Sequence, residues 1–525
     1  MPSRINIGPE NGPYVAINEE DGNLQLEDNS GNVVAEWDET NAQWDFANNT
    51  LNNVDALDSN SVNTEKVTIR WNADGDKSLQ DVVDDAPENA RIVGDLETQV
   101  VYGEEDLPIE IETDGLTLEY LNIKQEEYEV PDGFGPDEHL LWIKDADDVT
   151  IRNCWLDGSR PGDHEDDEMQ SQNANIAVGY GEACDNITIE NCWLKDPWAY
   201  GVGVNHEDTN HEFCSGITVQ NVKTWGFGDD GITYHRVDGG VIDNCRMWGA
   251  TDQTGNPFGV EIEWATHGVT VRDCIAWNNS IDHNNGGGYT VKDGGGNPAY
   301  DITFINCKAP EGNQRDYQMQ WDDDENHDDP VENPTVQLIG CSGTSDGAEN
   351  LQVRDYHATV LGGIYEHPDA SVSIRVEEQF ADPEEVRIRM SGYPTIREGY
   401  IRVEGGRYHR FNDIEMESMS THRGILFEGC DDGWVEGFRA ERGEIELRDG
   451  AGPIYFRGTF YSALDREIIV DGGTAVPKDA TLILDLSGGG FEPEEGAQAY
   501  DSNSDEPAYG DGTDWRSMID DSVIS

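Results

Sequence analysis

VTIRNC, at Val149–Cys154, is the first of seven related phrases that recur through the middle of this 525-residue chain. Each copy alternates apolar and polar residues and closes on Asn, Asp or Gly before a small apolar residue; the others are ITIENC (Ile187–Cys192), ITVQNV (Ile217–Val222), GVIDNC (Gly240–Cys245), VTVRDC (Val269–Cys274), ITFINC (Ile302–Cys307) and VQLIGC (Val336–Cys341). Alternation predicts a half-buried strand, and Asn predicts a corner after it because Asn tolerates left-handed backbone angles. Successive copies are 38, 30, 23, 29, 33 and 34 residues apart, which is typical of a solenoid. Several short strands per repeat, without helical periodicity, predict an all-β parallel β-helix.

The charge of the chain limits what it can bind. It has 33 basic and 108 acidic residues, a formal net charge of −75, and the acidic residues are spread along its length. Such a surface predicts a protein built for molar salt, where the Debye length falls to about 3 Å and self-repulsion is screened. Because no basic stripe is present to displace phosphate counterions, nucleic acid is excluded as a ligand.

Nine cysteines occur, and six of them occupy the same place in the repeat. Stacked equivalent positions bring like side chains together, which predicts a ladder of buried thiols that behave as small hydrophobic groups. Disulfides and metal binding are the less favoured alternatives, and no CxxC pair occurs. Since neither a signal peptide nor a long apolar run is found, the chain is expected to be cytosolic, exported by an unusual route, or carried outside as part of a particle.

Three regions are predicted along the chain. Residues 1–65 contain short strands broken by Asn, Asp and Gly that could not build a core alone, so they are interpreted as an attachment and oligomerisation region. Residues 66–475 form the β-helix. Residues 476–525 are interpreted as a C-terminal cap and acidic tail, with Ala480–Ser487 as the last strand.

The opening of the β-helix region carries a capping signal. In SLQDVVDDA (Ser78–Ala86), Ser78 can cap a short helix whose apolar stripe would cover the first coil; the stripe is Leu79, Val82 and Val83. Strands are predicted to follow at Ala90–Val93, Ile109–Ile111 and Leu116–Ile123. This order resembles that of pectate-lyase-like β-helix proteins, in which a helical cap precedes the first coils. The resemblance implies a right-handed parallel β-helix.

A further strand can be aligned in five successive coils. The copies are GVGVN (Gly201–Asn205), GITYH (Gly231–His235), GVEIE (Gly259–Glu263), GYTVK (Gly288–Lys292) and YQMQW (Tyr317–Trp321). Their outward residues form two rows, of which one is Gly203, Thr233, Glu261, Thr290 and Gln318, and the other Asn205, His235, Glu263, Lys292 and Gln320. Neighbours within a row are expected about 4.8 Å apart.

Two carboxylates in these rows suggest acid–base chemistry. Glu261 and Glu263 would face one side about 6.5–7 Å apart, at the lower edge of the separation found in inverting glycosidases. His235 and Lys292 flank Glu263 and favour its ionised form, as a base requires, whereas Glu261 lies between threonines and would hold the proton of an acid. A lyase using His235 or Lys292 as its base, or a solvated ladder without chemistry, are the alternatives.

Just upstream, GFGDDGITYH (Gly226–His235) places an Asp pair and a Gly before one of these strands. It resembles the aspartate motif of polygalacturonase-type β-helix hydrolases, where the aspartates activate water and protonate the leaving oxygen. The resemblance makes Asp229 and Asp230 catalytic candidates. No second aspartate motif, Gly-His-Gly or Arg-x-Lys signature accompanies it, so a structural Asp-Gly corner stays as the alternative.

Aromatic residues crowd the same coils. Trp225, Trp248 and Trp277 each follow the ladder position by three residues, so they are expected to stack. If these rings point into the fold, they belong to the core. If they point outward, they would offer flat faces to sugar rings, together with Trp264 and Tyr200. The density of tryptophan around one acidic face favours the second interpretation, a glycan-binding surface.

No cofactor or metal site is predicted. Two acidic loops, DHEDDE (Asp163–Glu168) and DDDENHDD (Asp322–Asp329), could hold a hard cation such as calcium, but neither has the spacing of an EF-hand. Solvated loops are the favoured interpretation in so acidic a chain.

An oligomerising N-terminal segment, a long β-helix, no secretion signal and strong acidity together resemble a tail spike or tail fibre of a tailed virus that infects a salt-loving archaeon. The resemblance implies a homotrimer on the virion in an extracellular, high-salt setting. Residues 1–65 would dock on other tail or baseplate proteins, and the β-helix would contact a host surface glycan or glycoprotein and in some cases cleave it. A free polysaccharide-degrading hydrolase or lyase, and a purely adhesive spike without turnover, are the alternatives.

Overall fold

The computed structural model divides the chain into two units, Met1–Lys66 and Val67–Ser525. It describes residues 67–457 with their side chains, apart from residues 73–74, 76, 104–105, 127–138, 160–172, 181–182, 206–211, 251–256, 280–285, 295–296, 322–333, 346, 369–370, 379–385, 418–422 and 441–443. Thr474 and Ala475 are also described, and elsewhere the backbone of the strands alone.

The first unit contains one antiparallel sheet of five short strands in chain order: β1 (Ile5–Ile7), β2 (Val15–Glu20), β3 (Asn23–Glu27), β4 (Val33–Asp38) and β5 (Gln43–Asp45). Short strands broken by polar residues were expected here. The attachment and oligomerisation role of this unit stays a prediction.

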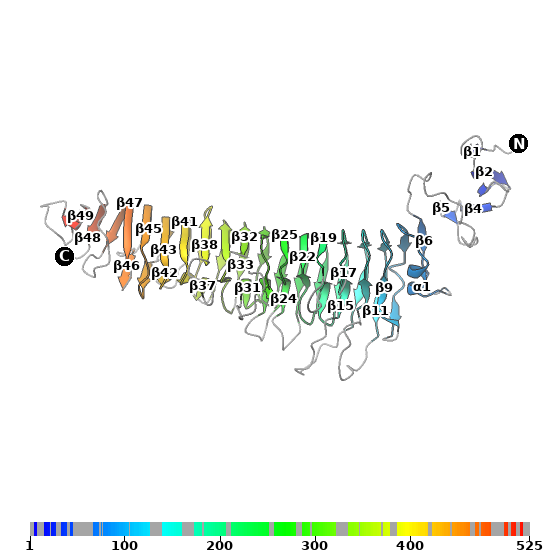
Figure 1. Ribbon diagram of the computed structural model, residues 1–525, viewed down its shortest axis with the longest axis horizontal. Helices are drawn as coiled ribbons and strands as arrows, with labels where there is room; N and C mark the ends of the chain where they lie inside the picture. Colours follow the sequence, from blue (N-terminus) through cyan, green and yellow to red (C-terminus); the bar gives the residue numbers. More distant parts are fainter. Residues whose placement is uncertain are drawn as a thin grey trace. The chain divides into compact units, whose positions relative to one another are not determined.

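The second unit is the predicted parallel β-helix, whose coils follow one another along the chain in Figure 1. Each complete coil contributes one strand to each of three parallel sheets. Sheet one consists of β6 (Thr68–Arg70), β7 (Arg91–Val93), β10 (Thr117–Glu119), β13 (Thr150–Arg152), β16 (Thr188–Glu190), β19 (Cys214–Gln220), β22 (Val237–Asp243), β25 (His267–Arg272), β29 (Ile302–Ile305), β32 (Thr335–Ile339), β35 (His357–Leu361) and β38 (Arg387–Ser391). Sheet two consists of β8 (Val100–Tyr102), β11 (Asn122–Gln125), β14 (Trp155–Asp157), β17 (Trp193–Lys195), β20 (Lys223–Trp225), β23 (Arg246–Trp248), β26 (Ile275–Trp277), β30 (Lys308–Ala309), β33 (Ser342–Thr344), β36 (Ile364–Glu366) and β39 (Thr395–Arg397). Sheet three consists of β9 (Ile109–Ile111), β12 (Leu141–Ile143), β15 (Ala174–Val178), β18 (Tyr200–Val204), β21 (Ile232–His235), β24 (Phe258–Glu263), β27 (Gly287–Gly294), β31 (Arg315–Gln320), β34 (Leu351–Arg354), β37 (Val372–Glu377), β40 (Tyr400–Glu404), β42 (Arg423–Glu428), β44 (Glu444–Arg448) and β46 (Ile468–Asp471).

The corner between sheets one and two is made by the residue that closes each copy of the repeat. All seven closing residues have left-handed backbone angles, with φ between 52° and 64°, a region that Asn, Asp and Gly adopt at low cost. The side chains also bond along the stack, since Asn244 Nδ2 donates to Asn221 Oδ1 at 2.6 Å. The predicted corner is confirmed.

The residues after the corner form the predicted thiol ladder. All nine cysteines are free and buried, and the six in the repeat have no exposed surface. Their thiols lie against backbone carbonyls, as in Cys274 Sγ to Arg272 O at 3.2 Å. They pack as small hydrophobic side chains in the core.

The first coil is closed by helix α1 (Leu79–Asp84), where the capping helix was predicted. The Ser78 side chain accepts a hydrogen bond from the backbone of Asp81, whose own side chain accepts one from the backbone of Ser78. This reciprocal pair fixes the start of the helix. Gln80 bonds both backbone groups of Glu110 on β9, at 2.8 and 3.1 Å, so the helix satisfies part of the exposed strand edge.

The C-terminal coils lose the corner between sheets one and two. β41 (Arg407–Glu417) pairs with both β38 and β39, and β43 (Asp431–Ala440), β45 (Ile454–Ser462) and β47 (Ala475–Leu484) continue it. The prediction that Ala480–Ser487 is the last strand is wrong. β48 (Gln498–Asp501) adds one more parallel strand beside β47, and β49 (Glu506–Gly510) and β50 (Trp515–Ser517) turn back antiparallel.

In the part of the chain that the structure describes, no helix has both the length and the apolar composition needed to cross a membrane.

Candidate functional site

The two rows predicted on the third strand of each coil lie in register on sheet three. Gly203, Thr233, Glu261, Thr290 and Gln318 are successive partners. In the other row His235 pairs with Glu263, and Lys292 pairs with Gln320. The alignment by inward apolar residues therefore placed the right side chains next to one another.

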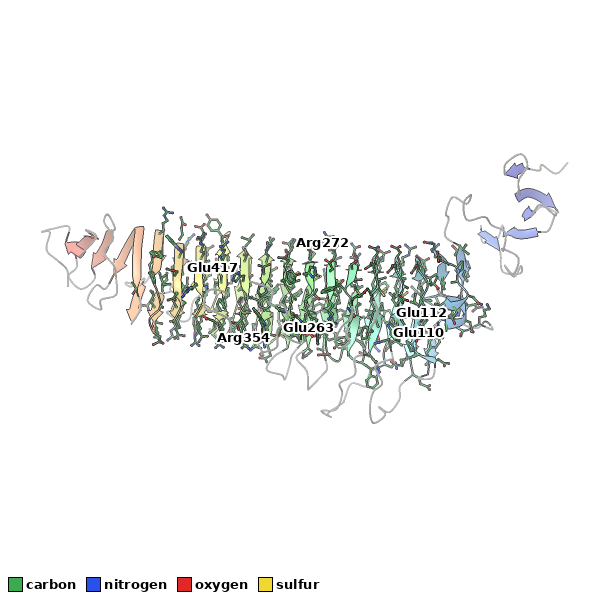
Figure 2. The ribbon with its side chains drawn as sticks, viewed as in Figure 1. Glu110, Glu112, Glu263, Arg272, Arg354 and Glu417 are labelled. Carbon is green, nitrogen blue, oxygen red and sulfur yellow. The ribbon has the colours of Figure 1, made fainter. Side chains whose placement is uncertain are left out.

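Both glutamates lie on the outer side of sheet three, because Ile262 between them is fully buried in the core. Figure 2 shows Glu263 on the same side of the ribbon as Arg354, another residue of sheet three. Their exposure is nevertheless only 4% for Glu261 and 8% for Glu263. The two glutamates therefore do not form a solvated ladder. They belong to a buried polar cluster.

Lys292 and His235 each contact both carboxylates. The Lys292 ammonium lies 2.5 Å from Glu261 Oε1 and 3.1 Å from Glu263 Oε2. His235 Nε2 lies 3.4 Å from Glu261 Oε2 and 3.2 Å from Glu263 Oε1. Since the charges are largely shielded from water, these contacts are stronger than surface ion pairs.

The ionisation of the pair is the reverse of the sequence-based prediction. Burial acts to raise the pKa of Glu261, but the charge of Lys292 and the hydrogen bond from His235 hold that pKa well below its usual value. Burial raises the pKa of Glu263, because the attraction of Lys292 is countered by the negative charge of Glu261. Of the two carboxyl groups, Glu261 is thus the one held more strongly in its ionised form, and Glu263 is the one that takes up a proton more readily. The row positions alone did not reveal that Lys292 reaches across to Glu261.

The separation of the two carboxyl groups also differs from the prediction. The facing donor atoms of His235, Glu261 and Glu263 all lie within 4.8 Å of one another. An inverting glycosidase needs about 6.5–9.5 Å to admit a water molecule, whereas retaining enzymes hold their carboxyl groups about 5–5.5 Å apart. The close approach of the facing oxygens is too short for an inverting enzyme and favours the retaining class over it, because the shared contacts with Lys292 and His235 draw the two side chains together.

Asp229 and Asp230 join the same cluster. Asp230 is 1% exposed and accepts a hydrogen bond from the backbone N–H of Phe258 at 2.6 Å. Burial, together with the charges of Glu261 and Asp229, raises the pKa of Asp230 well above its usual value, and the acid shares a hydrogen bond with Glu261. Asp230 thus positions Glu261 and ties two coils together. Asp229 is half-buried and accepts a hydrogen bond from the Tyr200 hydroxyl at 3.2 Å.

Trp264 forms one wall of the cluster. Its indole Nε1 donates to Glu263 Oε1 at 2.6 Å, and Arg236 lies over its ring at 5.3 Å. Trp264 has a φ of 57°, a strained value for a bulky residue. The ring packs directly on Gly294, where an added Cβ would lie 2.2 Å from Trp264 Cδ1. A glycine is needed there to keep the indole on Glu263.

The predicted stack of Trp225, Trp248 and Trp277 is present on the outer side of sheet two. Neighbouring ring centroids are 5.3 and 5.0 Å apart, with interplanar angles of 8° and 11°. The rings therefore cover one another's faces and present mainly their edges. A sugar ring rests on a face, so this geometry argues against the three as a sugar platform. Tyr200 is only 2% exposed and offers no face either, so Trp264 beside the carboxylates is the better candidate.

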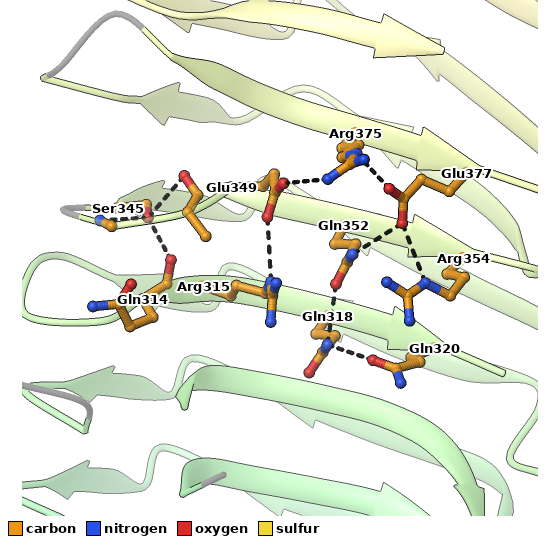
Figure 3. A network of polar contacts seen from close by, with 12 residues as sticks. Gln314, Arg315, Gln318, Gln320, Ser345, Glu349, Gln352, Arg354, Arg375 and Glu377 are labelled. Carbon is orange, nitrogen blue, oxygen red and sulfur yellow. Dashed lines mark hydrogen bonds and ion pairs between the residues drawn. The ribbon is translucent and has the colours of Figure 1, made fainter. Parts of the chain in front are cut away.

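Sequence reasoning missed the polar network that continues sheet three beyond Lys292. Figure 3 shows Gln318 donating to both Gln320 and Gln352, at 2.6 and 3.0 Å, and Gln352 donating to Glu377 at 3.1 Å. The signal that could have found it is LQVR at Leu351–Arg354, which repeats the pattern of YQMQ one coil later. The network extends the polar outer face of sheet three well past the carboxylates.

The cluster has a donor set that could hold a divalent cation. His235, Glu261 and Glu263 supply one donor atom each. Lys292 already provides a positive charge in contact with both carboxylates, so no metal is assigned to this site. The acidic loops at residues 163–168 and 322–329 lie outside the described residues.

No protein-family model matches the sequence, and no curated protein matches it. Among solved structures, the A-module of mannuronan C-5 epimerase AlgE4 from Azotobacter vinelandii is 13% identical, covers 71% of this chain and 91% of its own, and has a TM-score of 0.44. A hyperthermoactive exopolygalacturonase from Thermotoga maritima is 13% identical, with coverages of 74% and 91% and a TM-score of 0.36. Tailspike protein 3 of bacteriophage CBA120 is 10% identical, with coverages of 83% and 64% and a TM-score of 0.37. The sheet pairings themselves make the second unit a parallel β-helix, and the right-handed sense is the one that parallel strands joined by crossovers almost always adopt.

At sequence identities of 10–13% the similarity concerns the fold alone, so the chemistry is argued from the residues of this chain. In this β-helix all six predicted catalytic candidates meet in one place, which we call the carboxylate cluster: Asp229, Asp230, His235, Glu261, Glu263 and Lys292. Asp229 and Asp230 precede β21, and the other four side chains come from β21, β24 and β27.

Proposed function

We propose that the protein is a virion-surface tail spike whose β-helix binds a host surface glycan and hydrolyses it with retention of configuration at the carboxylate cluster. The observation that carries the proposal is the close pairing of Glu261, whose pKa is held low, with Glu263, whose pKa is raised, their facing donor atoms lying within 4.8 Å of each other. Two carboxyl groups whose environments push their pKa values apart are what acid–base catalysis of glycosidic cleavage requires.

The roles follow from the charge states. Glu263 gives its proton to the glycosidic oxygen as the bond to the anomeric carbon breaks, and an oxygen of Glu261 forms a bond to that carbon. In the second step the Glu263 carboxylate takes a proton from water, whose oxygen attacks the anomeric carbon and releases Glu261. Lys292 lies between the carboxyl groups, and its side chain is 32% exposed, so it can turn outward as a sugar enters.

A lyase is the second candidate that the sequence raised, and the charges disfavour it. Burial alone would lower the pKa of Lys292, but Glu261 and Glu263 hold it well above its usual value. Lys292 is therefore not a ready base for abstracting a proton from a sugar ring. His235, the other predicted base, directs its Nε2 at Glu261 and Glu263, at 3.4 and 3.2 Å, and not at open space beside the cluster.

Product analysis tests the hydrolase. Host-derived glycan incubated with the protein should release reducing ends without a new double bond, and NMR of the first product should show the anomeric configuration of the substrate. Unsaturated products would identify a lyase, and an inverted first product would remove Glu261 as nucleophile. A glycan bound but left intact would leave the adhesive spike as the function.

A tail spike must also assemble from several copies of the chain and attach to the virion. This part of the proposal is supported by the separate N-terminal sheet of short strands, since units too small to build a core are commonly stabilised by association. Residues 1–65 would form a homotrimer and dock on other tail proteins. The net charge of −75 supports an extracellular, high-salt setting, where self-repulsion between protomers is screened.

Light scattering of the full chain in molar salt is expected to give three times the mass of one protomer. Dilution into low salt should weaken the assembly, because the Debye length grows to about 30 Å at 0.01 M and the acidic protomers then repel one another. A monomer at every salt concentration would contradict the trimer.

A further inference from the structure

A group of arginines without acidic partners lies on the outer side of sheet one, several coils beyond the carboxylate cluster. Arg387 and Arg389 occupy alternate positions of β38, and Arg389 pairs with Arg410 of β41. Arg389 and Arg410 are exposed and Arg387 is half-buried. Alternate residues of a strand are about 6.6 Å apart and paired residues about 4.8 Å apart. We call these three residues the arginine patch.

This lack of partners is unusual in a chain with 108 acidic and 33 basic residues. Other arginines of the same sheet are paired: Arg152 lies 2.6 Å from Glu119, and Arg272 lies 2.8 Å from Asp243. Among the described residues, no carboxylate lies within ion-pair distance of the arginine patch. The one contact is between Arg387 Nη2 and His357 Nδ1 at 3.4 Å.

The three guanidinium groups act on one another. Burial lowers the pKa of Arg387, and the charges of Arg389 and Arg410 lower it further. Like charges this close are unfavourable unless an anion relieves them. Acidic residues do occur one strand further, at Asp432 and Glu436 of β43, but neither forms an ion pair with the patch.

An aromatic pair continues the patch along the coils. Arg410 pairs in register with Trp434 of β43, and Trp434 pairs with Tyr455 of β45. The rings of Trp434 and Tyr455 are stacked, with centroids 4.5 Å apart and an interplanar angle of 26°. Tyr408, which is 47% exposed, neighbours Arg410 on β41. Because these two rings cover one another's faces, they border the patch mainly with their edges, and the guanidinium groups are the part of this surface that suits a ligand with several anionic groups.

From this arrangement we infer that the arginine patch binds the anionic groups of an acidic glycan, either sulfate or carboxylate. The inference rests on the proposed function and deepens it, because it assigns the glycan to the acidic class. Arginine forks bind such planar or tetrahedral anions through two N–H groups at once. Because the three arginines occupy alternate and paired positions of adjoining strands, a ligand with several anionic groups can contact more than one of them. Sheet one is a different face from that of the carboxylate cluster, so the patch holds the polymer at a second point.

The net charge sets the conditions for the test. A polyanion is repelled by the rest of the chain at low salt, and in about 0.15 M salt the Debye length of about 8 Å limits that repulsion to nearby acids. Dextran sulfate and dextran are the probes, since they share a backbone and differ in charge. Wild-type protein is expected to bind dextran sulfate and not dextran. The double variant Arg389→Gln/Arg410→Gln should lose roughly tenfold or more in affinity, because two charge-assisted contacts are removed.

Arg272→Gln is the matched control, because Arg272 is an exposed arginine of the same sheet that already pairs with Asp243. It should bind dextran sulfate as the wild type does, and so should Glu261→Gln. Turnover of a host glycan that depends on Glu261 would leave the proposed function standing even if the patch binds nothing. Equal binding by the double variant, or equal binding of dextran, would overturn the inference. So would loss of self-association in the double variant without any glycan binding, which would make the patch a contact between copies of the chain.

Discussion

Replacing Glu261 with Gln is expected to lower kcat on the cleaved glycan by about 10³–10⁴-fold, the largest effect of any single change at the carboxylate cluster. The amide keeps the shape of the side chain and can still accept a hydrogen bond from Lys292, but it cannot attack the anomeric carbon. Initial rates at saturating glycan measure the loss. Thermal unfolding should be recorded beside the rates, because loss of the Glu261 charge leaves the half-buried Lys292 ammonium with a weaker partner and is expected to lower the stability of the variant.

Glu263→Gln separates the two roles. This variant loses the proton donor, so it should be slow on the natural glycan yet recover much of its first step on an aryl glycoside with a good leaving group, which needs no proton. Glu261→Gln should show no such recovery. If the two variants respond alike to the leaving group, the assignment of nucleophile and acid is wrong.

Lys292→Met gives an independent check through pH. Lys292 lowers the pKa of Glu261, so its removal must raise that pKa, and the carboxylate will be protonated at a higher pH. The acidic limb of kcat/KM against pH, which reports the base of the free enzyme, should therefore move to higher pH. An unmoved limb would show that Glu261 is not the group that must be ionised.

The fold could be predicted from the sequence because its signals are local and recur in every coil. Asn191 and Cys192 alone say little, but a residue that tolerates a left-handed angle, followed by a small apolar residue, recurs at each corner and defines the register of the coils. This register alone predicts that Glu261, Glu263, His235 and Lys292 are neighbours. Capping by Ser78 was readable for the same reason.

What the sequence did not reveal depends on how far side chains reach. Lys292 lies in the row of Glu263, yet its four-carbon chain brings the ammonium closer to Glu261, and this decides which carboxylate is charged. The burial of both glutamates depends on neighbours such as Trp264, whose strained backbone no propensity indicates. The stacked faces of Trp225 and Trp248 follow from ring rotation, which the strand period does not specify.

The second large effect is expected from a substitution in the hydrophobic core. Phe304→Ala is expected to cost about 3–5 kcal/mol of local stability, because a fully buried ring is removed and a cavity is left. Phe304 makes edge contacts with Tyr289 of the preceding coil, at 5.6 Å between centroids, and with Tyr317 of its own coil, at 6.1 Å. In a solenoid each coil is stabilised mainly by its neighbours, so the loss should be concentrated in β25, β29 and β32.

Amide hydrogen exchange measures this directly, because it reports the free energy of opening strand by strand. Protection of β29 should fall by roughly 10²–10⁴-fold, while β13, five coils away in sheet one, should keep its protection. Tyr393→Ala is the control: Tyr393 is 69% exposed, and surface substitutions are usually within about 0.5 kcal/mol of neutral. A uniform loss of protection along all coils would mean that the β-helix opens as one cooperative body, and that stacking couples its coils over longer distances than nearest neighbours.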